Sequence, residues 1–148
     1  MDAKKPIVMI ADSNEDLIWL YERWIRQEGC HVKIAKSGDW VLAQMVPEPP
    51  DLVLLNLSIE GLNGLEVCRQ LKQADSFAPL KVIGVADFLD FGMQQQAILA
   101  GADVVLVKPI SRTELTTHLC KLLNLEAAGE LEDQIQDLER KVWASTSG

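Results

Sequence analysis

The chain has few residues of the kinds that build disulfide scaffolds or metal centres. Its 148 residues include only two histidines and three cysteines, Cys30, Cys68 and Cys120, which are widely spaced and form no CxxC pair. Scattered cysteines in odd number predict free thiols in a reducing compartment, and the two histidines lie at no spacing typical of metal ligands. The sequence therefore favours neither a disulfide framework nor a structural metal site.

Long apolar runs and an excess of positive charge are also missing. No segment approaches the roughly 20 apolar residues that a membrane-spanning helix needs. The chain carries 14 Lys and Arg against 22 Asp and Glu, a net charge of -8, whereas nucleic-acid binding needs clustered positive charge. Residues 1–6 lead into a strand-like segment without a cleavage-site pattern. We expect a cytoplasmic protein that contacts neither membrane nor, through this domain, nucleic acid.

Sequence motifs of common enzymes are absent as well. The chain contains no GxGxxG, P-loop, nucleophile elbow or metal-ligand cluster. We therefore expect no catalytic activity and no cofactor. Because α/β sheets host many functions, a flavodoxin-like enzyme or cofactor binder remains an alternative.

Apolar segments typical of strands alternate five times with helical patterns. The strand-like segments are 7–11, 31–35, 52–55, 80–85 and 104–107. The first helical segment is indicated by a stripe of Leu17, Leu20, Tyr21 and Trp24 and ends at Gly29. Three more helical segments follow at 39–45, 65–73 and 92–100. A last helix is indicated by Ser111 and Glu114, which form a capping-box pattern. Continuously apolar strands separated by helices predict a doubly wound parallel sheet with helices on both faces.

In such sheets the functional residues gather at the carboxyl ends of the strands. The residues at those ends are Asp12-Ser13, Asn56-Leu57-Ser58, Ala86-Asp87 and Lys108-Pro109. With the segments 8–12, 50–56, 61–67, 100–103 and 107–109, the chain resembles the receiver domain of bacterial two-component response regulators over about residues 5 to 124. The resemblance implies a flavodoxin-like, five-stranded sheet in the order 2-1-3-4-5. It divides the chain into a receiver-like domain, 1–124, and a C-terminal helical extension, 125–148.

The resemblance also implies roles for residues at this edge. In the family, an aspartate on the third strand accepts a phosphoryl group from a histidine kinase, and two acids help to bind Mg²⁺. A Ser or Thr hydroxyl and an aromatic side chain respond, and a Lys-Pro pair contacts the charge. This chain keeps Asp12, Lys108 and Pro109, but it has Ser13 for the second acid, Asn56 for the acceptor, Ala86 for the hydroxyl and Val105 for the aromatic.

Asn56 is the decisive departure, because a carboxamide is neutral and a very poor nucleophile. With Asp12 and Lys108 as the only charged groups expected in a pocket that includes Ser13 and Ser58, we expect weak or absent Mg²⁺ binding. An amide both donates and accepts hydrogen bonds. We therefore expect Asn56 to bridge Asp12 and a backbone carbonyl in one locked conformation.

Each of these residues also has an ordinary explanation. Asp is common at helix N-caps, Lys at solvated surfaces, and Asn at turns, which would account for Asp12, Lys108 and Asn56. Deliberate replacement of an aspartate at position 56 is a further alternative. It leaves unexplained why Ser13 and Ala86 also differ from the family pattern.

Two sets of large apolar side chains are candidates for a protein-binding surface, because aromatic residues and Met are enriched in interfaces. Trp19 and Trp40 are expected to face solvent on the first two helices. The segment after the fourth strand contains Phe88, Leu89, Phe91 and Met93. The alternatives are that an early helix start buries the second set, and that neighbouring side chains cover the tryptophans.

The extension carries an apolar repeat. Leu131, Ile135, Leu138 and Val142 recur at spacings of four, three and four, as in a coiled-coil seam. Two heptads are too short to pair stably alone. We favour a helix that contributes to a homodimer, while a connection to an output domain and packing onto the receiver-like domain remain open.

These patterns together favour a degenerate receiver that signals through a protein partner in its pathway, without aspartyl phosphorylation. The alternative is conventional phosphorelay signalling in which another carboxylate, Asp87 or Asp12, accepts the phosphoryl group. The two hypotheses differ in whether a phosphoryl donor modifies the chain.

Overall fold

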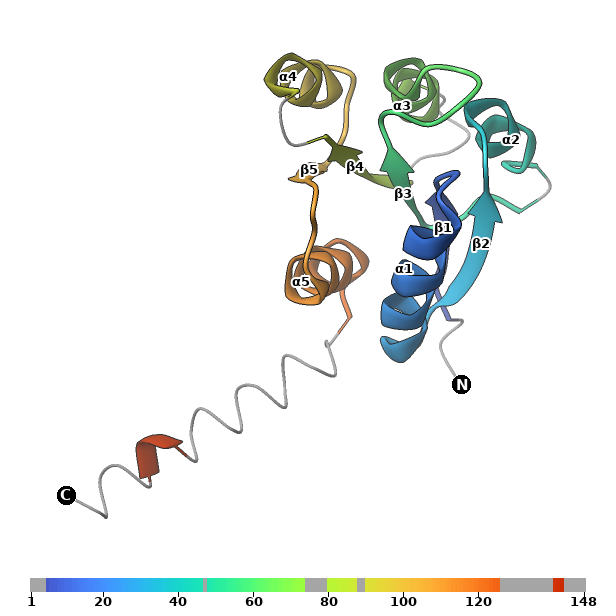
Figure 1. The fold of residues 1–148 in the computed structure, drawn as a ribbon. Coiled ribbons are helices and arrows are strands. Elements are labelled where there is room, and N and C mark those ends of the chain that lie inside the picture. The colour runs from blue at the N-terminus through green and yellow to red at the C-terminus, as the bar shows by residue number, and fades with distance from the viewer. Residues whose placement is uncertain (1–4, 47, 74–79, 88–89, 126–139, 143–148) are drawn as a thin grey trace.

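A computed structural model describes residues 5–46, 48–73, 80–87, 90–125 and 140–142. Five strands alternate in it with five helices (Figure 1). The strands are β1 (Ile7–Ala11), β2 (His31–Ala35), β3 (Leu52–Asn56), β4 (Lys81–Ala86) and β5 (Val104–Val107). The helices are α1 (Glu15–Gln27), α2 (Gly38–Ala43), α3 (Gly64–Gln73), α4 (Phe91–Leu99) and α5 (Arg112–Leu123). The strands are parallel in the order β2-β1-β3-β4-β5, which confirms the predicted fold class.

Side chains of each strand alternate between two apolar layers, one on each face of the sheet. Val8 and Ile10 of β1 pack with residues of α1 and α5, whereas Met9 and Ala11 pack with residues of α2, α3 and α4. Figure 1 shows this division of the helices between the two faces. Because both faces are covered, β1 and β3 are buried along their whole length. This explains why their sequences are continuously apolar instead of alternating.

Helix α1 packs on the sheet along a line that differs from the predicted one. The predicted stripe consisted of Leu17, Leu20, Tyr21 and Trp24. In the structure the buried residues are Ile18, Tyr21 and Ile25, while Leu17, Leu20 and Trp24 are half-buried. Both lines have helical spacing, because apolar residues occupy a wide arc of this helix. Periodicity did not distinguish the line that faces the sheet from the line on its flank.

Element boundaries move by one or two residues from the predicted ones. The predicted helix 39–45 is observed as α2, Gly38–Ala43, and the predicted strands 52–55 and 80–85 each end one residue later. Asn56 and Ala86 are therefore the last residues of β3 and β4. The predicted helix cap is confirmed, because the Glu114 backbone N–H donates a 3.0 Å hydrogen bond to Ser111 Oγ.

Most of the C-terminal extension lies outside the described residues. Leu131, Ile135 and Leu138 are among the residues that are not described. Val142 is described and is 62% exposed. The coiled-coil seam therefore stays a prediction. Within the described ranges, no helix has the length and apolar character required to cross a membrane.

Gly64 lets α3 begin directly against the segment that follows Asn56. A Cβ atom at Gly64 would lie 2.6 Å from the Leu57 carbonyl oxygen and 2.7 Å from the Leu57 Cα. These are backbone atoms, which cannot turn aside as a flexible side chain can. The absence of a side chain at Gly64 thus sets how closely α3 approaches the carboxyl end of β3.

We expect Gly64→Ala to lower the free energy of unfolding by about 2 kcal/mol, because overpacking a filled site costs about 1–3 kcal/mol. Gly92→Ala is the matched control: Gly92 also lies in the first turn of a helix, α4, but an added Cβ would meet nothing within 4 Å. Alanine favours helix more than glycine does, so this control should be neutral or slightly stabilising. Denaturant unfolding measures both variants, and equal stabilities would contradict the role of Gly64.

Candidate functional site

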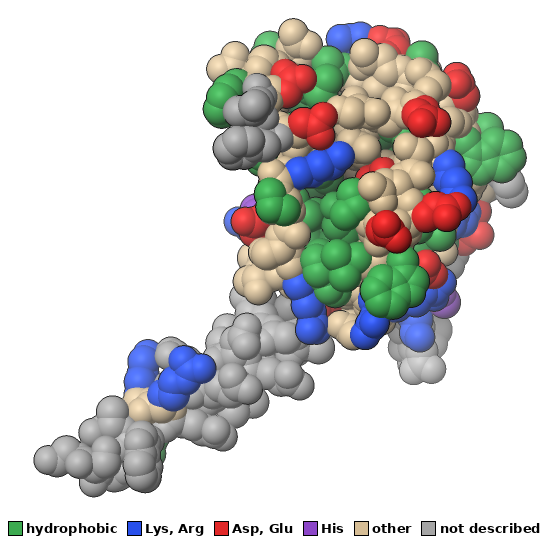
Figure 2. Space-filling view, viewed as in Figure 1, with side chains coloured by type: hydrophobic (Ala, Val, Ile, Leu, Met, Phe, Trp, Pro, Cys, Tyr) green, Lys and Arg blue, Asp and Glu red, His purple; other side chains and the backbone are tan. Residues whose placement is uncertain are grey.

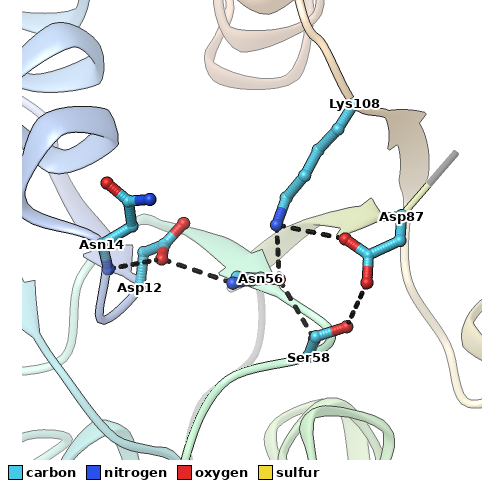
Figure 3. Close-up of polar contacts among 6 residues, drawn as sticks. All are labelled: Asp12, Asn14, Asn56, Ser58, Asp87 and Lys108. Carbon is cyan, nitrogen blue, oxygen red and sulfur yellow. Dashed lines mark hydrogen bonds and ion pairs between the residues drawn. The ribbon is translucent and has the colours of Figure 1, made fainter.

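The carboxyl ends of four neighbouring strands bring polar side chains together. Asp12 follows β1, Asn56 ends β3, Asp87 follows β4 and Lys108 follows β5. Figure 3 shows these side chains pointing toward one another, with Ser58 below them. The parallel sheet produces this grouping, because all its strands end at the same edge. We call Asp12, Asn56, Ser58, Asp87 and Lys108 the edge pocket.

The Asn56 carboxamide connects the two sides of the edge pocket. Its Nδ2 donates a 3.3 Å hydrogen bond to Asp12 Oδ1, and its Oδ1 accepts bonds from the Ser58 backbone N–H at 3.0 Å and Lys108 Nζ at 3.3 Å. The predicted contact with Asp12 is confirmed. The predicted second partner, a backbone carbonyl, is wrong, because within the described residues Nδ2 donates only to Asp12. No buried side-chain nitrogen or oxygen in the described residues lacks a hydrogen-bond partner.

Asp12 is buried, with 3% of its surface exposed. Its Oδ1 also accepts a 2.9 Å hydrogen bond from the Asn14 backbone N–H. The alternative that Asp12 caps the following helix is wrong, because Asn14 is the N-cap of α1 and accepts from the Asp16 and Leu17 backbone N–H groups. An Asn just before an acidic first turn, here Glu15-Asp16, is a recognisable cap signal that the sequence-based prediction did not use.

Asp87 is the charged residue that was missing from the predicted pocket. Its Oδ1 lies 3.4 Å from Lys108 Nζ, and its Oδ2 accepts a 3.0 Å hydrogen bond from Ser58 Oγ. The expectation that only Asp12 and Lys108 are charged is therefore wrong. The signal was available, since Asp87 directly follows β4 at the functional edge.

The remaining predicted positions surround the edge pocket without adding charge. Ala86 is fully buried, and Val105 is half-buried against the layer that contains α2, α3 and α4. Ser13 is half-buried, and its hydroxyl has no hydrogen-bond partner in the described part of the chain. The Lys108–Pro109 peptide bond is cis.

As arranged here, the edge pocket offers Mg²⁺ few of the oxygen ligands that it prefers. This ion prefers six oxygen ligands in octahedral geometry. Asn56 turns a nitrogen toward Asp12, its oxygen is held by Lys108 and Ser58, and the Lys108 ammonium repels a cation. In the described ranges no group of three or more His, Cys, Asp or Glu side chains forms a metal-binding cluster.

Three predicted surface residues are exposed. Phe91 of α4 is 68% exposed, Trp19 of α1 58% and Trp40 of α2 56%. Figure 2 shows hydrophobic side chains reaching the surface over α1, where Arg23 lies 4.8 Å from the centre of the Trp19 ring. Met93 is half-buried, and Phe88 and Leu89 lie outside the described residues.

Trp40 lines a shallow groove beside the edge strand β2. The groove has a volume of about 420 Å³, and its other lining residues are Ile34, Lys36 and Ser37. Lys36 Nζ lies 3.1 Å from Glu15 Oε1, so this ion pair connects a lining residue of the groove to the start of α1.

Tyr21 of α1 is buried, and the charge of Asp12 affects its pKa. Burial, and secondly the negative charge of Asp12, raise the pKa of its phenol from 10.0 to about 12. Because the pKa of Tyr21 is higher in the folded state, its protonation contributes to the free energy of unfolding. This contribution is fully present below pH 10 and is lost as the pH rises from 10 towards 12.

We expect the phenolate absorbance of the folded protein to appear with a midpoint near pH 12, and near pH 10 in denaturant. Tyr21 is the only tyrosine in the chain, so ultraviolet titration reports it directly. Asp12→Asn should lower the folded midpoint by part of the shift, and Tyr21→Phe should abolish the signal. A midpoint near pH 10 in the folded protein would contradict burial of the phenol.

Known proteins resemble this chain in both sequence and fold. The response regulator receiver domain family matches residues 8–120. The chain is 30% identical over 120 residues to the DNA-binding response regulator MtrA of Mycobacterium tuberculosis, covering 80% of this chain and 51% of the relative. It is 28% identical to the alkaline phosphatase synthesis transcriptional regulatory protein PhoP of Bacillus subtilis, covering 78% and 48%. It therefore spans about half the length of these curated relatives.

Solved structures agree with this assignment. A response regulator from Chloroflexus aurantiacus superimposes with a TM-score of 0.77 at 24% identity, covering 82% of this chain and 99% of that one. A response regulator receiver protein from Burkholderia phymatum gives 0.71 at 29% identity, covering 84% and 99%. From its sequence, its strand order and these matches, the chain belongs to the family of response regulator receiver domains.

Proposed function

We propose that this receiver domain signals through protein contacts and is not phosphorylated on an aspartate. The observation that carries the proposal is the Asn56 carboxamide at the acceptor position, with both polar atoms engaged by Asp12, Ser58 and Lys108. A carboxamide has no anionic oxygen with which to attack a phosphoryl donor. The edge pocket then keeps one arrangement, as in a degenerate receiver.

The loss of phosphoryl chemistry extends to the residues around Asn56. We propose that the pocket retains no Mg²⁺, because Asp12 is the only carboxylate in contact with Asn56 and Lys108 supplies an opposing charge. Ala86 offers no hydroxyl to a phosphoryl group, and Val105 has no ring that could change position. The domain is accordingly proposed to have no enzymatic activity and to need no cofactor.

The output is proposed to pass through exposed apolar side chains to a protein partner in a signalling pathway. Phe91, Ile98 and Leu99 form an apolar face on α4, with exposures of 68%, 53% and 87%, and Trp19 and Trp40 are further anchors of the kind enriched in interfaces. We place the protein in the cytoplasm. Self-association through the C-terminal helix stays part of this proposal.

We expect no response to phosphoryl donors. Addition of acetyl phosphate, or of beryllofluoride with Mg²⁺, should leave the amide resonances of Asp12, Asn56, Asp87 and Lys108 unshifted, because position 56 carries no carboxylate nucleophile. Intact mass should also stay unchanged after treatment with acetyl phosphate. Shifts confined to these strand ends, or an acid-labile adduct, would overturn the proposal, and an adduct mapped to Asp87 would favour phosphorelay signalling through a different acceptor.

We expect Asn56→Asp to lower the free energy of unfolding by about 2 kcal/mol without divalent cations, because it places a second carboxylate against buried Asp12 and removes a donor. Mg²⁺ should restore much of this loss in the variant by binding the folded state, and should leave the native protein unchanged. Asn63→Asp, the same chemical change at an exposed position, is the control. Stabilisation of the native protein by Mg²⁺ would contradict the proposal.

A further inference from the structure

Asp87 joins three strand ends through one carboxylate. The residue follows β4, its Oδ1 lies 3.4 Å from Lys108 Nζ after β5, and its Oδ2 accepts a 3.0 Å hydrogen bond from Ser58 Oγ after β3 (Figure 3). Each oxygen has a different partner on a different strand end. The carboxylate is thus bound at two points, although its side chain is 57% exposed.

Lys108 needs an anion close by, because its side chain is only 25% exposed and a partly buried ammonium is costly without a partner. Asn56 offers it a neutral oxygen, and Asp12 lies on the far side of that amide. In the described part of the chain, Asp87 is the only carboxylate within ion-pair distance of Lys108. The protein therefore supplies the counter-ion from its own β4 end.

The backbone of Asp87 connects the same point to helix α4. The Asp87 carbonyl accepts a 3.1 Å hydrogen bond from the Asp90 backbone N–H. Asp90 is the N-cap of α4: its Oδ1 accepts from the Met93 N–H at 3.0 Å, and its carbonyl accepts from the Gln94 N–H at 3.3 Å. The hydrogen bonds run from the pocket into the first turn of α4 without interruption.

Helix α4 depends on such an attachment because it is packed lightly. Ala97 is its only buried residue, and its apolar face of Phe91, Ile98 and Leu99 is turned to solvent. A helix with few buried side chains has a low local stability, so contacts at its ends govern how often it opens. One such contact is the hydrogen bond from the Asp90 backbone N–H to the Asp87 carbonyl.

We propose that Asp87 is an internal counter-ion that fixes Lys108 and Ser58 and positions the first turn of α4, and with it the exposed apolar face. Asp87 is a positioning residue in this role. This role rests on the proposed function, in which α4 contacts a partner protein. The edge pocket would then determine how α4 is presented to that partner without binding a phosphoryl group.

The test is hydrogen exchange of the Met93 and Gln94 amides, measured by NMR without any phosphoryl donor. Asp87→Ala and Lys108→Met should each speed this exchange by about fivefold, the factor for about 1 kcal/mol, which is the upper end for a pair of this exposure. The double variant should exchange no faster than either single one, because both remove the same contact. Asp87→Asn, which keeps an acceptor for Ser58, should lie between the native protein and Asp87→Ala.

Glu15→Gln is the matched control, since it removes the Glu15–Lys36 ion pair of 3.1 Å at the same edge of the sheet and should leave α4 unchanged. Unchanged exchange in Asp87→Ala or Lys108→Met, additive effects in the double variant, or equal acceleration in Glu15→Gln would overturn the role of Asp87. If Asp87→Ala does not fold, Lys108→Met decides by itself. Because no phosphoryl donor is present, failure here leaves the proposed function standing, and a phosphorylated native chain leaves this result intact.

Discussion

The pocket depends on one amide that lies between a carboxylate and an ammonium. Asn56 presents Nδ2 to Asp12 and Oδ1 to Lys108. The reverse orientation would set the amide oxygen against a carboxylate and the NH₂ group against an ammonium, so the two charges determine which way the amide points. A carboxylate at position 56 would satisfy Lys108 but repel Asp12. The neutral amide is the group that satisfies both neighbours without an added cation.

Charge balance follows from that arrangement. Two carboxylates, Asp12 and Asp87, and one ammonium, Lys108, leave the edge pocket with a formal charge of -1, and Asp87 is partly exposed to water, which screens it. Every buried side-chain polar atom in the described ranges has a partner. The pocket therefore holds the strand ends together as a structural unit. Helix α4 is attached to it through the hydrogen bond from the Asp90 backbone N–H to the Asp87 carbonyl.

Sequence patterns predicted the sheet and part of the site, for reasons that particular residues make clear. Continuously apolar strands and the residues that follow them placed Asp12, Asn56 and Lys108 at one edge, because parallel strands share their direction. The buried line of α1 was predicted only in part: Tyr21 is buried as expected, while Leu17 and Trp24 pack at its flank. Leu17 and Ile18 both belong to lines with helical spacing, and only the sheet selects between them. Asp87 directly follows β4, so its place at this edge could be predicted, but its contacts with Ser58 and Lys108 depend on the reach of its side chain, which no spacing along the chain encodes.

The departures from the family pattern are physically linked to one another. Ala86 is completely buried beside the pocket, and a Ser or Thr there would bury a hydroxyl that has no phosphoryl group to contact. An unsatisfied buried hydroxyl costs about 1–3 kcal/mol, so alanine is the stable choice once position 56 is neutral. Val105, half-buried against the layer that includes Ala97 of α4, similarly fills space by packing alone. If position 56 accepts no phosphoryl group, as we propose, neither position needs a polar or mobile side chain, and Ala86 and Val105 favour one fixed conformation.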